Sequence, residues 1–126
     1  MNTRAITAFA AAVTALALLA AGCGVGSTDD GEVAATTGTY LSALADADYE
    51  LACEQLAPAA RPEGDCAAAV ERSVQGISRD AIREDADGKT TVEVTGDEAT
   101  VTLQSGRTLG LAKTGETWLV ESGYKG

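Results

Sequence analysis

The hydrophobic period of this chain changes near residue 90, and that change constrains the fold more than any other feature. Before it, apolar residues recur every three or four positions, which is typical of amphipathic helices. After it, they alternate with polar residues in "TTVEV", "ATVTL", "TLGLA" and "TWLVES", with turn sequences between. The pattern predicts an α+β fold, in which about three N-terminal helices pack on a curved antiparallel sheet of about four strands.

The first predicted helix lies in "EVAATTGTYLSALADADYE", where Val33, Thr37, Leu41 and Leu44 fall near helical spacing. Asp29 and Glu32 stand three residues apart, as in a capping box, and are candidates to cap its start. Gly38 lies in its interior and costs about 1 kcal/mol relative to alanine.

Two shorter helices are predicted next. The second begins at Asp48 and ends before Pro58, because proline cannot continue a helix. The third is capped by Asp65 and presents one amphipathic face. That face consists of Cys66, Ala69, Val70, Ser73, Val74 and Ile77. Residues 78–88 fit a helical extension, a short edge strand or a loop.

The N-terminus carries one cation, Arg4, followed by an uncharged apolar run that ends in "AAGC" at Cys23. The run is shorter than the roughly 20 residues of a membrane-spanning helix. This order resembles a bacterial lipoprotein signal, although Leu19 stands one place further from the cysteine than in the family pattern. A plain secretory signal, an uncleaved anchor and a soluble protein with an ordinary cysteine are the alternatives.

The lipoprotein resemblance implies a domain organisation and a location. Residues 1–22 would be a signal peptide, and Cys23 would receive a diacylglyceryl group. Residues 23–31 would form a flexible tether, and residues 32–126 a single α+β domain. The protein would then be bound to the extracytoplasmic face of the cell membrane through a lipid anchor.

The charge and composition exclude several classes of function. Removing residues 1–22 takes away Arg4 and leaves 8 basic against 19 acidic side chains, a net charge of −11. Such a charge disfavours nucleic acid as a partner. The chain has no histidine, so it lacks the commonest general base and neutral metal ligand. We therefore predict no metal site and no cofactor.

Cys53 and Cys66 are the pair that remains when Cys23 is set aside, and an exported protein favours a disulfide between them. The bridge would close a loop of about 14 residues and contribute about 3 kcal/mol to stability. A metal site built on these two thiolates would need two further ligands.

Four stretches together resemble small exported bacterial proteins of the nuclear transport factor 2-like, or cystatin-like, superfamily. They are "YLSALADADYELACEQLAP", "GDCAAAV", "VEVTGDEATVTL" and the final strand with its tryptophan, and they span about Val33 to Ser122. The resemblance implies a cone-like α+β domain. It does not fix the function, because this superfamily includes both enzymes and binding modules.

Two short motifs are similar to known ligand loops but lack essential residues. "GKT" at residues 88–90 has Arg83 where a phosphate loop needs glycine. "EDADG" at residues 84–88 resembles part of a calcium loop, but Arg83 and Val94 occupy two of its ligand positions. We interpret the first as a turn and the second as a solvated acidic loop, with weak calcium binding as its alternative.

The predicted function is a non-catalytic binding or interaction module of the cell envelope, whose partner is an envelope protein or a small ligand. Tyr40, Tyr49 and Trp118 are candidate pocket-lining residues, with burial in the core as their other role. The alternative is a small enzyme like the ketosteroid isomerases of the superfamily. That resemblance points to Tyr40, Tyr49, Asp46 and Asp48, but the scarcity of aromatic residues leaves little to build a dry pocket.

Overall fold

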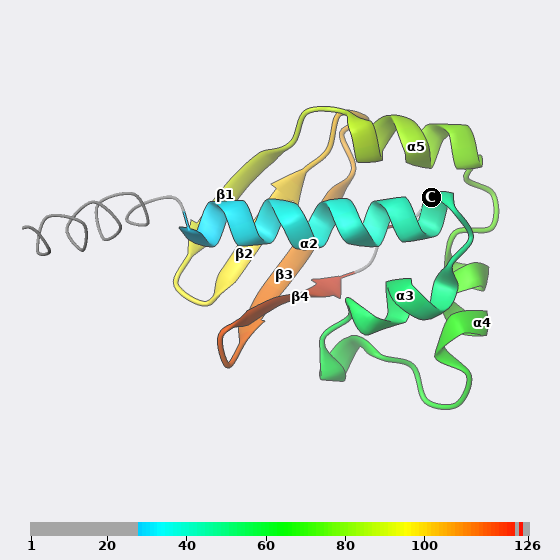
Figure 1. Cartoon of the computed structure of the whole chain (residues 1–126), viewed down its shortest axis with the longest axis horizontal. Helices are drawn as coiled ribbons and strands as arrows, with labels where there is room; N and C mark the ends of the chain where they lie inside the picture. Colours follow the sequence, from blue (N-terminus) through cyan, green and yellow to red (C-terminus); the bar gives the residue numbers. More distant parts are fainter. Residues whose placement is uncertain (1–27, 123, 125–126) are drawn as a thin grey trace, which may run out of the picture.

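The computed structural model describes residues 28–122 and residue 124, and these residues form an α+β fold, as the change of period predicted. Helices fill the first half of this part and strands the second (Figure 1). No helix within it is both long and apolar enough to cross a bilayer. In chain order the elements are α2 (Thr28–Ala45), α3 (Tyr49–Glu54), the 3-10 helix η1 (Pro58–Ala60), α4 (Cys66–Ser73), α5 (Arg79–Asp87), β1 (Thr91–Thr95), β2 (Glu98–Thr102), β3 (Thr108–Thr114) and β4 (Thr117–Ser122).

Helix α2 begins at Thr28, so residues 28–31 of the expected tether are helical. Asp29, expected as a cap, lies instead in the first turn and bonds across to the sheet. Its carboxylate accepts hydrogen bonds from the Trp118 indole N–H at 3.3 Å and from the Lys113 ammonium group at 3.4 Å. The start of α2 is therefore tied to the hairpin formed by β3 and β4.

The described chain has four α-helices where about three were predicted, and the addition is α5 in the segment that the sequence left open. Ser78 caps α5 by accepting a hydrogen bond from the Ala81 N–H at 3.1 Å. Ile82 is buried on the side of α5 that faces the core. Helix α4 stops at Ser73, short of the predicted face, and the chain then turns at Gly76 with φ of +96°.

The interpretation of residues 84–88 as a solvated acidic loop is wrong. Glu84 to Asp87 form the last turn of α5, and Asp85 is only 2% exposed. A helical backbone cannot wrap its side chains around one cation as a calcium loop does. Residues 88–90, the "GKT" stretch, form the connection between α5 and β1.

The sheet is an antiparallel meander in the order β1-β2-β3-β4, as predicted. Two of its connections are two-residue turns, and each begins with a glycine of positive φ: Gly96 at +63° and Gly115 at +66°. Glycine adopts this conformation without steric cost, so the "TG[D/E]" sequences set these two hairpins.

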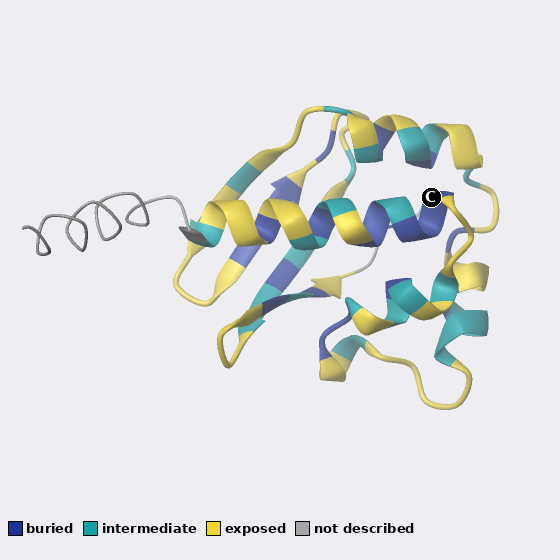
Figure 2. Cartoon of the chain, in the orientation of Figure 1, coloured by how far each residue is buried: buried dark blue, intermediate teal, exposed yellow. Residues whose placement is uncertain are grey.

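Helix α2 lies across one face of the sheet with α5 beside it (Figure 1), and the buried residues gather between these layers (Figure 2). The opposite face of the sheet carries exposed threonine and glutamate side chains. The core residues of α2 and the strands are Val33, Tyr40, Leu41, Ala43, Leu44, Ala45, Ala99, Val101, Leu109, Leu111, Trp118 and Val120. The strand positions among them alternate as predicted.

The outer edge of β4 is covered by earlier parts of the chain. The Val120 N–H donates to the Gln55 carbonyl, and the Ala57 N–H donates to the Val120 carbonyl, both at 2.7 Å. The Thr36 hydroxyl donates to the Trp118 carbonyl at 3.0 Å. These bonds satisfy the edge of the strand and hold the segment after α3 against the sheet.

We expect Thr37→Val to stabilise the protein. Thr37 is 1% exposed, and its hydroxyl has no hydrogen-bond partner among the described residues. Replacing an unpaired buried hydroxyl with a methyl group of similar volume should raise the free energy of unfolding by about 1 kcal/mol. Urea denaturation at neutral pH measures the change.

Thr39→Val is the matched control, because Thr39 lies on the exposed face of the same helix. It should change stability by less than about 0.5 kcal/mol. A loss of stability in Thr37→Val would mean that the buried hydroxyl is hydrogen-bonded in solution.

Candidate functional site: an apolar cleft beside the disulfide

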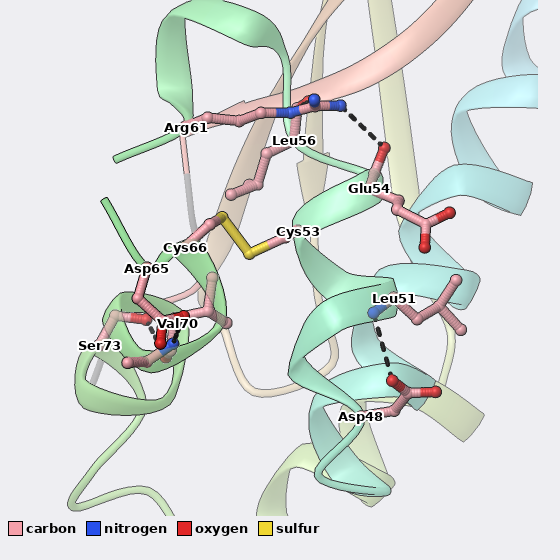
Figure 3. The surroundings of a disulfide bond; sticks show 11 residues. Asp48, Leu51, Cys53, Glu54, Leu56, Arg61, Asp65, Cys66, Val70 and Ser73 are labelled. Carbon is pink, nitrogen blue, oxygen red and sulfur yellow. Dashed lines mark hydrogen bonds between the residues drawn. A yellow bond between two sulfur atoms is a disulfide. The ribbon is translucent and has the colours of Figure 1, made fainter. Parts of the chain in front are cut away.

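The predicted disulfide is present and joins α3 to α4 (Figure 3). The Cα atoms of Cys53 and Cys66 are 6.2 Å apart, within the range of unforced bridges. Asp65 caps α4 as predicted by accepting from the Ala68 N–H at 3.1 Å. Asp48, the predicted start of the second helix, caps α3 by accepting from the Leu51 N–H at 3.2 Å. Local capping starts each helix, and the covalent bond sets their mutual position.

An apolar cleft of about 430 Å³ lies next to this bridge. The buried side chains of Tyr40, Leu56 and Val70 form its floor, and they come from α2, the segment after α3, and α4. Ala69 and Ser73 form one wall along α4. The volume lies within the range of small-ligand and side-chain pockets in proteins.

The other wall of the cleft is the end of β4, with Glu121 and Ser122, while Ala60 and Pro62 close one end. Here β4 contains a bulge, since Val120 pairs with Leu111 and Ser122 pairs with Gly110. A Cβ atom on residue 110 would lie 2.8 Å from the Ser122 hydroxyl oxygen. A side chain at position 110 would therefore require the Ser122 hydroxyl to rotate away.

The linker between η1 and α4 is fixed by Arg61. Its Nε donates to the Leu56 carbonyl at 3.1 Å and its Nη2 donates to the Glu54 carbonyl at 3.5 Å (Figure 3). These carbonyls belong to the end of α3 and the segment after it, so the bonds satisfy groups that a helix end leaves free. The linker is thereby drawn against the cleft.

The three aromatic residues predicted to line a pocket do not meet in one place. Tyr40 lies in the floor of the cleft. Tyr49 is half-buried against the core at the start of α3 and is not among the residues that line the cleft. Trp118 is 1% exposed and borders a separate, shallow hollow near the start of α2.

The two carboxylates considered for an enzyme are solvated and have structural partners. Both border a groove of small residues between α2 and α3. Asp46 forms a salt bridge with Arg83 on α5, and Asp48 caps α3. The geometry gives no support to acid–base catalysis by this pair, which would need a drier environment.

A buried polar network that sequence reasoning missed surrounds Asp85. The Tyr124 hydroxyl donates to its carboxylate at 2.6 Å, and the N–H and hydroxyl of Ser105 donate at 3.0 and 2.8 Å. The Arg107 guanidinium lies 4.0 Å from the same carboxylate and 5.2 Å from the centre of the Tyr124 ring. Asp85 stands three residues after buried Ile82, and this helical spacing was the available signal.

The environment of the network shifts its pKa values in opposite directions. Burial raises the pKa of Asp85, but the bonds from Tyr124 and Ser105 and the Arg107 charge outweigh it and bring that pKa below its usual range. Burial raises the pKa of Tyr124 to about 12, together with the hydrogen bond to Asp85 and the negative charge of that carboxylate. Asp85 is thus held ionised and Tyr124 neutral at physiological pH, which suits a structural clamp.

Tyr40 connects this network with the cleft. Its hydroxyl hydrogen-bonds to the main chain of Tyr124, and burial raises the pKa of Tyr40. Because the Tyr40 hydroxyl already has a hydrogen-bond partner, the contribution of Tyr40 to the cleft floor is apolar. Cys23, the predicted lipidation site, lies outside the described residues.

Comparisons with protein-family models, with curated proteins and with solved structures found no significant match to this chain.

We expect reduction of the Cys53–Cys66 bridge to destabilise the protein by about 3 kcal/mol, because the unfolded chain regains the entropy of the closed loop. Urea unfolding with and without a phosphine reductant measures the difference. The double variant Cys53→Ala/Cys66→Ala is the control, and its unfolding should not respond to the reductant. Equal stability of oxidised and reduced chains would contradict this role.

We expect Tyr124→Phe to lower the free energy of unfolding by about 2 kcal/mol at pH 7, because it removes a hydrogen bond to a buried charge. The folded pKa of Asp85 lies below its unfolded value, so the network stabilises the fold above the usual carboxyl pKa. That stabilisation is lost as the pH falls through the folded pKa. The difference between the two chains should therefore shrink towards about pH 3.

Tyr49→Phe is the control for this measurement, since Tyr49 is a half-buried tyrosine outside the network. It should change stability by less than about 0.5 kcal/mol at either pH. If Tyr124→Phe lowers the free energy of unfolding by the same amount at every pH, Tyr124 stabilises the fold by packing alone.

Proposed function

We propose that the protein is a lipid-anchored, non-catalytic interaction module on the extracytoplasmic face of the cell membrane. The observation that carries this proposal is the apolar cleft, which has a buried aromatic floor and a wall joined to α3 by the disulfide. An open cleft of this size suits recognition of a partner or ligand. The groups that line it do not form a nucleophile–base pair.

The proposed anchor is a diacylglyceryl group on Cys23. The apolar run before "AAGC" supports it, as does the position of Cys23 five residues before α2 begins at Thr28. The disulfide is also typical of an oxidising, extracytoplasmic compartment. The mature chain would then be held at the membrane through the segment that leads into the start of α2.

We further propose a nuclear transport factor 2-like, cone-like form for the domain. The order of elements supports it, with helices first and a four-strand meander after, and α2 laid across one face of the sheet. In such a form the cleft floored by Tyr40 would correspond to the mouth of the cone. This position favours a small-ligand binder as the second candidate function, with the same residues as its site.

We expect the protein from the membrane fraction of a bacterial host to have the mass of a chain that begins at Cys23 plus a diacylglyceryl group. Intact mass spectrometry measures this, and alkylation should add label only after reduction because Cys53 and Cys66 are bridged. Cys23→Ala should abolish the lipid mass and the membrane association. Cys53→Ala/Cys66→Ala is the matched control and should keep both. A membrane-bound chain that retains residues 1–22, or a secreted chain without lipid, would contradict the anchor.

A further inference from the structure

The cleft lining contains one charged side chain, Glu121, within the part of the chain that is described. It lies exposed in the β4 wall, and among residues 28–122 and 124 its carboxylate forms no salt bridge and accepts no hydrogen bond. The carboxylates of Asp29, Asp46 and Asp85 each form a salt bridge with a basic side chain. Glu121 is therefore available to a cationic group that enters beside the apolar floor.

The burial of the lining residues indicates how a partner would fit. The floor is buried, whereas the rim residues Pro62, Ser73, Glu121 and Ser122 are exposed. A small ligand in a trough of this kind would keep much of its surface in water, unlike ligands in enclosed pockets. A side chain that projects from a protein segment instead buries itself in the floor, while its main chain runs along the open rim.

The charge of the whole chain favours one class of partner. The net charge of −10 attracts a cationic segment and repels a second copy of the same chain. Glu121 adds a local negative charge at the cleft itself. Both the long-range and the local charge thus favour a basic residue next to the apolar one.

We propose that the cleft binds an extended segment of a partner protein, in which an apolar side chain enters the floor and a neighbouring lysine or arginine pairs with Glu121. The proposal rests on the proposed function, because it names the partner of the same module. The disulfide has a direct part in it, since Cys66 is the first residue of α4 and the cleft wall lies one turn further along.

The test uses the processed full protein in neutral phosphatidylcholine nanodiscs and three acetylated, amidated hexapeptides: GGLKGG, GGLQGG and GGAKGG. Isothermal titration calorimetry measures binding, with empty nanodiscs as the blank. GGLKGG should bind tightest. GGLQGG should bind about threefold to fivefold weaker, the usual range for a partly exposed ion pair. GGAKGG should bind at least about tenfold weaker, because it loses most of a buried leucine side chain.

Two variants locate the binding. Glu121→Gln should bind GGLKGG and GGLQGG equally, and Glu98→Gln, at an exposed strand position on β2, should keep the wild-type preference. Ala69→Trp should fill the cleft and abolish binding of GGLKGG. Ala34→Trp, at an exposed position of α2, should bind as the wild type does. Circular dichroism shows whether each variant is folded.

Several results would overturn the proposal. One is a wild-type chain that binds none of the peptides, or that binds GGLQGG as tightly as GGLKGG. Binding of leucinamide alone as tightly as GGLKGG would assign the cleft to a small ligand. A dimer that Ala69→Trp disrupts would assign it to a second copy. If the mass measurement finds a secreted chain without lipid, the same titrations on that chain test the cleft separately from the anchor.

Discussion

The pairing of the Val120 main chain with the segment after α3 is the constraint on which the rest of the structure depends. Through the bonds to Gln55 and Ala57, the helical half of the chain is joined to the last strand of the sheet. Leu56 is buried between these two bonds and becomes part of the cleft floor. The same contact closes the edge of β4, which would otherwise be open to pairing with other chains.

The disulfide acts on the part of the fold that this pairing does not reach. Helix α4 packs mainly on α3, and Val70 is the one residue of this helix that is buried. A covalent link to α3 compensates for this small apolar contact. It also places α4 beside the end of β4 as a wall of the cleft. Stability and the shape of the candidate site therefore share one cause.

Much of the candidate site could not be predicted from the sequence. The counting of cysteines identified Cys53 and Cys66, and Tyr40 was considered as a lining residue. Glu121 and the buried carboxylate of Asp85 gave no comparable local signal. The position of Glu121 depends on a bulge in β4, and Asp85 is satisfied by Tyr124, 39 residues further along the chain. Asp85 looks like solvated surface until its distant partners are placed, and Glu121 gains its position in the cleft only once β4 lies opposite α4.

The sequence by itself determined the α+β class, the caps at Asp48 and Asp65, the two glycine hairpins and the alternation of the buried strand positions. Each of these follows from interactions between residues a few positions apart, or from a period that one face of an element repeats. Only the tertiary structure decided that residues 79–87 form a fourth helix, that Trp118 and Tyr40 lie apart, and where the cleft opens. Those outcomes depend on long-range burial and hydrogen bonding, such as the bond from Tyr124 to Asp85, which no local pattern reveals.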